Sequence, residues 1–372
     1  MHVAMTVNAA WNIWNFRKPI VEALLAGGHQ VTVLAPPDAF VSPLKELGCQ
    51  FVPLDMNAKG LNPIDEVRLW RRFARIFKEL QPDIILSYTI KNNTFGALAA
   101  KSLGIPFIPN VSGLGTGFLS GGILQFIVEQ LYRRAYRNLP VIFFQNEDDR
   151  DLFAARGLAR ADQARLLPGS GIDLDHFAAT ALRSCEAPVF LLIARLLRDK
   201  GVMEFVEAAR KIRTERPDVR FQLLGAAGSE NRTAISEATV QGWVDEGLVE
   251  YLGTTSDVRP VIAAATCVVL PSYREGAPRT LIEAAAMARP LIATDVPGCR
   301  AVVDHEETGF LCKVRDVDSL AAAMRRFFGL TPEEQAAMGQ AGRTKMEHAY
   351  DQRLVVQAYC DAIHSLMGQT VL

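Results

Sequence analysis

The sequence lacks the patterns that mark several common protein classes. Its six cysteines are scattered without a Cys-x-x-Cys pair and its six histidines show no ligand spacing, which argues against a disulfide framework or a zinc site. No apolar run approaches the roughly 20 residues of a membrane-spanning helix. A net charge of −1 gives no support for nucleic-acid binding through a basic surface. No Gly-x-Gly-x-x-Gly follows an apolar strand, which excludes a dinucleotide-dependent dehydrogenase.

The composition is that of an ordinary globular enzyme. Hydrophobic residues make up 49% and charged residues 22% of 372 residues, a length that suits two domains. The first apolar run begins at His2 with no signal-peptide pattern before it, and unpaired cysteines suit a reducing compartment. We therefore expect a two-domain cytoplasmic protein.

Short β-branched apolar runs alternate with longer amphipathic stretches, a pattern typical of βαβ units with parallel sheets. The strands are expected at 2–7, 31–35, 51–53, 84–88, 107–111 and 141–145, and then at 189–194, 220–224, 249–251, 267–270, 290–294 and 309–311. A Pro- and Gly-rich stretch at 166–177 is the candidate hinge. We expect an N-terminal domain over 1–168, a second over 169–348, and a final helical segment over 349–372. The sequence leaves open whether that segment packs on the second domain or back on the first.

The segment 272–283 (SYREGAPRTLIE) carries two carboxylates. An apolar strand precedes it and a helix is expected to begin near Pro278, where free backbone N–H groups form an anion- or hydroxyl-binding site. Glu275 would then lie in the loop and Glu283 about one and a half turns into the helix, so the two would face different parts of one extended ligand. The alternative is that Glu275 is a helix-dipole acid and Glu283 a solvated helix residue.

The segment 191–201 (LLIARLLRDKG) carries two cations. Arg195 ends an apolar strand and Lys200 opens the next helix, so both would meet at the carboxyl end of the sheet, where open α/β folds bind ligands. A diphosphate leaving group needs two such cations if no metal neutralises it. Alone, the pattern also fits a surface arginine and a helix-entry lysine. Together with the carboxylate loop, it predicts a site for a nucleotide-diphosphate sugar.

The Arg-x4-Lys and Glu-x7-Glu segments, followed by EAAAMARPLIATDVPG, resemble the donor domain of glycosyltransferase family 4. The stretches NAAWNIWNFRKPIVEALLAGGHQVTVLAP, TIKNNTFGALAAKSLGIP and NVSGLG resemble one branch of that family. It includes bacterial enzymes that add N-acetylgalactosamine to undecaprenyl-diphosphate-linked bacillosamine, and relatives that build capsule and O-antigen repeat units. The resemblance covers nearly the whole chain. It implies the GT-B fold, two Rossmann-like domains whose parallel sheets face a central cleft, and a retaining transfer from a UDP-sugar that needs no metal or other cofactor.

The resemblance also implies roles for residues of the second domain. Arg195 and Lys200 would hold the donor diphosphate and stabilise the departing UDP, while Glu275 would contact the transferred sugar at its reacting face. These three are the catalytic candidates. Attack on the same face through an oxocarbenium-like state would retain the configuration. The further donor candidates are Leu252 and Gly253 beside the base, Gly276 and Ala277 through backbone N–H groups, and Glu283 at the ribose hydroxyls.

The first domain departs from the family pattern in two loops. Many members have a Gly-Gly loop after the first strand and a His-Gly pair after the fifth, where this chain has residues 8–12 (NAAWN) and Ser112-Gly113. We therefore do not assign a histidine of this domain to the acceptor site. Each remaining candidate has an alternative as a capping or surface residue. The acceptor candidates are Asn12, Asn15, Arg17, Lys91, Asn92 and Ser112.

Two helical stretches, 67–80 and 123–139, mix aromatic residues with clustered arginines. The helical spacing of their apolar residues fits a domain core. The alternative is contact with an anionic membrane surface, which the implied lipid-linked acceptor favours. The residues that would make this contact are Trp70, Phe73, Phe126, Tyr132, Arg71, Arg72, Arg133 and Arg134. This reading predicts a peripheral protein on the cytoplasmic face of the inner membrane.

Other ligands and functions fit the sequence less well. Two Asp-rich stretches, 148–151 and 173–175, fit capping and turn roles better than a metal site. A nucleotide-sugar epimerase could use the same scaffold, but it would lack this pairing of Arg-x4-Lys with Glu-x7-Glu. A non-catalytic glycan-binding module is a third option, and the intact set of four charged residues argues against it. The sequence thus predicts a glycosyltransferase with a nucleotide-sugar donor and a lipid-linked saccharide acceptor.

Overall fold

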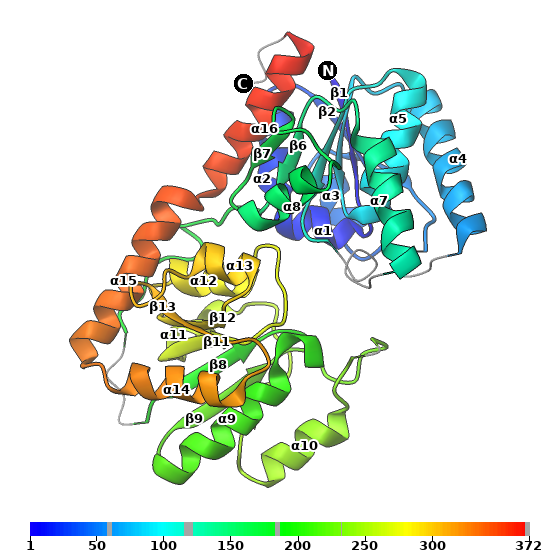
Figure 1. The fold of residues 1–372 in the computed structure, drawn as a ribbon. Coiled ribbons are helices and arrows are strands. Elements are labelled where there is room, and N and C mark those ends of the chain that lie inside the picture. The colour runs from blue at the N-terminus through cyan, green and yellow to red at the C-terminus, as the bar shows by residue number, and fades with distance from the viewer. Residues whose placement is uncertain (58–61, 115–121, 183–186, 232, 369–372) are drawn as a thin grey trace. The chain divides into compact units, whose positions relative to one another are not determined.

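The computed structural model describes residues 1–57, 62–114, 122–182, 187–231 and 233–368. The chain divides into two compact units, the first formed by Met1–Gly171 with Gln352–Leu372 and the second by Ile172–Asp351. Each unit is a parallel β-sheet with helices on both faces (Figure 1). The predicted α/β class with two parallel sheets is therefore confirmed.

The sheet of unit 1 has seven parallel strands in the order β3-β2-β1-β4-β5-β6-β7. Their bounds are β1 (His2–Thr6), β2 (Gln30–Ala35), β3 (Gln50–Pro53), β4 (Ile84–Tyr88), β5 (Phe107–Val111), β6 (Ile142–Phe144) and β7 (Ala164–Leu166). The first six match the predicted runs. The seventh was missed because it is a short, mostly exposed edge strand without an apolar run. The strand order reverses between β1 and β4, which gives this unit a topological switch point.

Two layers of helices cover this sheet, because its side chains alternate between the faces and both faces are apolar. Val3 and Met5 of β1 face one helical layer, and Ala4 faces the other. The first layer contains α1 (Ala10–Phe16), α2 (Lys18–Ala26), α3 (Val41–Glu46) and α16 (Gln352–Met367). The second layer contains α4 (Pro63–Leu80), the π-helix η1 (Asn92–Gly96), α5 (Ala97–Leu103), α7 (Gly122–Tyr136) and α8 (Glu147–Ala155).

The sheet of unit 2 has six parallel strands in the order β10-β9-β8-β11-β12-β13. They are β8 (Val189–Ile193), β9 (Arg220–Leu224), β10 (Glu250–Tyr251), β11 (Cys267–Leu270), β12 (Leu291–Thr294) and β13 (Gly309–Cys312). One layer of helices contains α9 (Val202–Glu215), α10 (Glu237–Asp245) and α14 (Val317–Phe328). The other contains α11 (Arg259–Ala264), α12 (Arg279–Ala286), α13 (Pro297–Val302) and α15 (Pro332–Ala349).

The end of the chain differs from the prediction of one helix that begins at Ala349. Helix α15 ends at that residue, and α16 begins at Gln352. Helix α15 was missed because its buried face contains glycines where an amphipathic helix usually has apolar side chains. Gly339 is needed there because a Cβ at this position would lie 2.3 Å from the carbonyl oxygen of Ala288. Its capping box, formed by Thr331 and Glu334, is the sequence signal that could have revealed it. Helix α16 packs in the core of unit 1.

Candidate active site

The two charged segments of unit 2 meet at the switch point of its sheet, where the strand order reverses between β8 and β11. Lys200 lies in the 3-10 helix η2 (Arg198–Lys200), after β8, and Glu275 lies in the loop after β11. The Nζ atom of Lys200 is 2.5 Å from Oε1 of Glu275. Their side chains are only 24% and 13% exposed, so the ion pair is largely shielded from water. The structure therefore brings a cation and a carboxylate together where open α/β sheets bind ligands.

Close backbone approaches hold these loops in place. Gly201 has φ 71°, and a Cβ there would lie 2.0 Å from the carbonyl oxygen of Pro271, so only glycine fits. The backbone N–H of Tyr273 donates to the carbonyl of Asp199 at 2.9 Å. On the other side, the N–H of Gly298 donates to the carbonyl of Glu275 at 3.2 Å. The loop that carries Glu275 is thus fixed between η2 and α13.

Helix α12 follows this loop and presents Glu283. Thr280 Oγ1 donates to the carbonyl of Ile193 at 3.1 Å, which ties the start of the helix to the end of β8. Glu283 accepts from Arg279 Nε at 2.7 Å, four residues earlier on the same helix. Burial raises the pKa of Glu283 above its ordinary value, and Arg279 offsets part of this rise. Sequence reasoning identified Glu283 but not its arginine partner.

The remaining predicted donor residues follow neighbouring strands at the same edge. Arg195 is exposed just after β8, and Gly276 and Ala277 lie between Glu275 and α12. Leu252 and Gly253 follow β10, and the carbonyl of Gly253 accepts from the N–H of Gly225 at 2.7 Å. The structure therefore places every predicted donor residue at or just beyond the carboxyl edge of the sheet in unit 2.

Tyr273 is a residue of this loop that sequence reasoning missed. Its hydroxyl donates to Oε1 of Glu204 at 2.6 Å, and the guanidinium carbon of Arg315 lies 4.4 Å from the centre of its ring. Burial is the main cause that raises the pKa of Tyr273 to about 12, so its hydroxyl stays a hydrogen-bond donor at neutral pH. Tyr273 links the Glu275 loop to helix α9, a long-range contact for which the sequence holds no signal.

The predicted acceptor residues of unit 1 fall into two groups. Arg17 and Asn92 are buried: Arg17 Nη1 donates to Ser170 Oγ at 2.6 Å, and Asn92 Nδ2 donates to Thr6 Oγ1 at 2.7 Å. Both hydrogen bonds lie in the interior of unit 1. The others reach the surface at least in part, although Lys91 pairs with Glu66 and Asn15 donates to the carbonyl of Trp11. The surface group consists of Asn12, Asn15, Lys91 and Ser112.

The two helices considered for membrane contact are mostly core elements, but each keeps an exposed aromatic residue. Phe73 and Tyr132 are 0% and 1% exposed, so the prediction that they contact lipid is wrong. Trp70 and Phe126 are 37% and 61% exposed. Arg72 pairs with Asp55, and Arg133 Nη2 donates to the carbonyl of Arg156. Arg71 and Arg134 are exposed.

The described residues lack two features, a membrane-spanning helix and a cluster of metal-binding side chains. None of their helices combines the length and the hydropathy that a membrane crossing requires. Nor do they contain a group of three or more His, Cys, Asp or Glu side chains placed to hold a metal ion. Five cysteines in the described ranges are free and buried, while Cys185 lies outside those ranges.

Two Rossmann-like units, one with cationic and acidic loops at its switch point, define the architecture of the GT-B glycosyltransferases. Residues 14–169 match the family described as "Glycosyl transferase 4-like domain", and residues 187–329 match "Glycosyl transferases group 1". The chain belongs to glycosyltransferase family 4, and it is a glycosyltransferase.

Relatives of known name share most of its length. The chain is 27% identical to the N,N'-diacetylbacillosaminyl-diphospho-undecaprenol alpha-1,3-N-acetylgalactosaminyltransferase of Campylobacter jejuni, over 96% of this chain and 97% of that one. It is 24% identical to the UDP-Gal:alpha-D-GlcNAc-diphosphoundecaprenol alpha-1,3-galactosyltransferase of Escherichia coli, over 72% of each chain.

Solved structures share the fold. HepE of Anabaena, solved in complex with UDP-glucose, superposes with a TM-score of 0.79 at 18% identity and covers 98% of this chain and 100% of its own. The sucrose-phosphate synthase of Thermosynechococcus elongatus reaches the same TM-score at 20% identity and covers 99% of each chain.

Proposed function

We propose that this glycosyltransferase moves a sugar, an N-acetylhexosamine such as N-acetylgalactosamine, from a UDP-sugar to an undecaprenyl-diphosphate-linked saccharide in bacterial glycan assembly. The observation that carries the proposal is the Lys200–Glu275 ion pair at the switch point of unit 2, where Arg195 also follows β8. The names of the Campylobacter and Escherichia relatives support the lipid-linked acceptor. The UDP-glucose complex of HepE, which has the same fold, supports the UDP-sugar donor.

In this proposal, Arg195 and Lys200 bind the donor diphosphate and neutralise the charge that grows on it as the glycosidic bond breaks. The ammonium group of Lys200 has three N–H donors, so it can keep Glu275 while it binds a phosphate oxygen. Glu275 is thereby held in position to accept from hydroxyls of the transferred sugar. The ribose hydroxyls bind Glu283, and the backbone N–H groups of Gly276 and Ala277 bind the diphosphate or the sugar.

The transfer is proposed to retain the configuration at the anomeric carbon. In this proposal Glu275, ion-paired with Lys200, binds hydroxyls of the sugar and forms no covalent bond to it. The acceptor hydroxyl would instead attack the anomeric carbon from the same face from which the leaving group departs. An oxygen of the departing diphosphate would take the proton of that hydroxyl. The two cations supply the charge stabilisation that a divalent metal would otherwise supply, so we propose that neither metal nor cofactor is needed.

The acceptor places the enzyme at a membrane. We propose that unit 1 binds the acceptor and rests on the anionic cytoplasmic face of the inner membrane as a peripheral protein. The exposed Trp70 and Phe126, together with the exposed Arg71 and Arg134, support this contact. Nucleic acid is not a proposed partner, since the net charge is −1.

Substitution of the two cations tests the proposed donor site. Arg195→Ala or Lys200→Ala should lower kcat/KM for the UDP-sugar by at least about a hundredfold, because the loss of one donor to a developing oxyanion costs about 3 kcal/mol. Lys211→Ala is the matched control, because Lys211 is a cation of the same unit that pairs with Asp318 on the surface. Turnover by Arg195→Ala and Lys200→Ala equal to that of the control would refute the assignment.

A further inference from the structure

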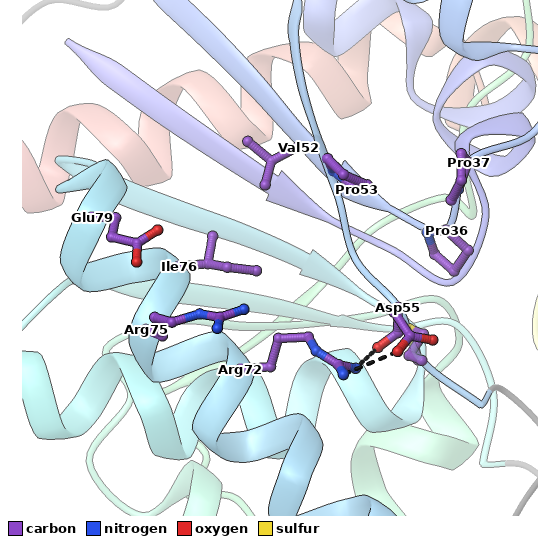
Figure 2. A pocket seen from close by; sticks show the side chains of 10 residues that line it. Pro36, Pro37, Val52, Pro53, Asp55, Arg72, Arg75, Ile76 and Glu79 are labelled. Atoms are coloured by element: carbon purple, nitrogen blue, oxygen red, sulfur yellow. Dashed lines mark hydrogen bonds and ion pairs between the residues drawn. The ribbon is translucent and has the colours of Figure 1, made fainter.

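Unit 1 contains a cavity of about 620 Å³, which lies between its edge strand β3 and helix α4 (Figure 2). Val52 of β3 and Ile76 of α4 form an apolar part of its lining, while Pro36 follows β2 and Pro53 is the last residue of β3. Its volume lies in the range of small-molecule sites, roughly 300 to 1,000 Å³. The cavity belongs to unit 1 and is formed without any residue of the donor site.

Two arginines from successive turns of α4 line this cavity. Arg72 Nη2 lies 3.0 Å from Oδ2 of Asp55, and Arg72 also donates to the backbone carbonyl of Asp55. Arg75 has no hydrogen bond or ion pair with any other residue in the described part of the chain. Figure 2 shows both side chains extending in the same direction, toward the loop that carries Asp55. Arg72 is therefore held in place, while Arg75 keeps its guanidinium donors available.

The charged groups that line the cavity are compatible with a bound anion. The side chain of Asp55 is 89% exposed, so water solvates much of the only carboxylate that pairs with Arg72 in the described ranges. Glu79 lies one turn beyond Arg75 on α4, at the end of the lining away from Asp55, and in the described chain it pairs with neither arginine. Two arginines that line one cavity favour a ligand with several anionic oxygens, because each planar guanidinium can donate two hydrogen bonds to phosphate.

We propose that this cavity binds the diphosphate of the lipid-linked acceptor, with Arg75 and Arg72 as its donors. The inference rests on the proposed function for the identity of the acceptor. The apolar lining suits the hydrocarbon that follows the diphosphate, since a polyprenyl diphosphate is itself part anionic and part apolar.

The test separates this cavity from general attraction between α4 and an anionic surface. Arg75→Ala should raise the KM for the lipid-linked acceptor at least about tenfold and leave kcat at saturating acceptor and the KM for the UDP-sugar unchanged. Lys78→Ala is the matched control, because Lys78 is an exposed cation on the same helix that does not line the cavity. Equal acceptor KM values for the two variants would overturn the assignment to the acceptor.

A second measurement is independent of turnover. Calorimetric titration of inorganic pyrophosphate into the protein saturated with UDP should show one site in the wild type and in Lys78→Ala, weakened at least about tenfold in Arg75→Ala. Absence of any Arg75-dependent pyrophosphate site would overturn the proposal. If no UDP-sugar is transferred to any lipid-linked saccharide, the proposed function fails, but an Arg75-dependent pyrophosphate site would still establish the anion site. An Arg75-dependent site with an unchanged acceptor KM would show that its ligand is a soluble phosphate compound and would overturn the lipid assignment.

Discussion

Glu283 illustrates how a binding group can cost stability. Its side chain is 13% exposed, and its only ion pair in the described chain is with Arg279, whose side chain is 32% exposed. A carboxylate removed from water loses solvation that one half-solvated partner does not fully restore. The resulting rise in the pKa of Glu283 means that the folded protein binds this proton more tightly than the unfolded chain does. The stability that comes from the neutral form is complete below the ordinary carboxyl pKa and is lost as the pH rises through the raised value.

Glu283→Gln should therefore remove a pH-dependent loss of stability. Relative to the wild type, the free energy of unfolding of the variant should increase, meaning greater stability, as the pH rises from below about 4.5 to 8. The donor KM should rise at least about tenfold, because a hydrogen bond to a charged group contributes about 1.5 to 3 kcal/mol. Denaturant unfolding at several pH values and initial rates measure these effects.

Helix α15 offers a matched control for that substitution. Arg343 and Glu347 form an ion pair with the same four-residue spacing and a distance of 2.6 Å, but Glu347 is 45% exposed. Glu347→Gln should show neither the rising stability difference nor the change in donor KM. A stability difference between Glu283→Gln and wild type that stays flat with pH would contradict the account of Glu283.

At the scale of elements, α4 and α7 combine core packing with an exposed, partly aromatic and cationic side. Leu69, Phe73, Ile76 and Phe77 of α4 are buried in the core of unit 1. Trp70 on α4 and Phe126 on α7 are exposed, as are Arg71 and Arg134. Arginines and exposed aromatics of this kind bind the interface of anionic bilayers.

Reversal of two of these charges tests membrane contact. Each exposed cation contributes up to about 1 kcal/mol of attraction to an anionic surface, so Arg71→Glu with Arg134→Glu should weaken liposome binding at least about tenfold at low salt. Wild-type binding should weaken as salt rises. The same double reversal at Arg210 and Lys211, on α9 of unit 2, serves as the control and should change binding less. If the wild type does not bind anionic liposomes at low salt, the membrane contact is refuted.

The strands with uninterrupted apolar runs, such as β8 and β11, could be predicted from the sequence to within a residue, because burial on both faces needs such runs. Helix α15 and strand β7 could not, since one buries glycines and the other is an exposed edge. Among the site residues, the position of Lys200 and Glu275 at the same edge of the sheet followed from the parallel direction of the strands. Their ion pair was not predicted. The burial of Arg17 depends on Ser170, 153 residues away, and no local pattern reports such a contact.

At the scale of the whole molecule, each unit has its own sheet, its own core and its own switch point. The donor candidates cluster at the switch point of unit 2, and the cavity with the two arginines lies in unit 1. In the proposed function, unit 2 binds the donor and unit 1 binds the acceptor, so each substrate has a binding domain of its own. The acceptor class is accordingly the central claim about the protein.

Product analysis tests that claim most directly. The protein would be incubated in excess EDTA with a panel of UDP-sugars and undecaprenyl-diphosphate-linked saccharides, and the lipid products analysed by mass spectrometry. The account predicts that the lipid-linked saccharide gains one N-acetylhexosamine from one UDP-sugar of the panel. If no UDP-sugar yields a glycosylated lipid, or if transfer occurs only after a divalent metal is restored, the account is contradicted.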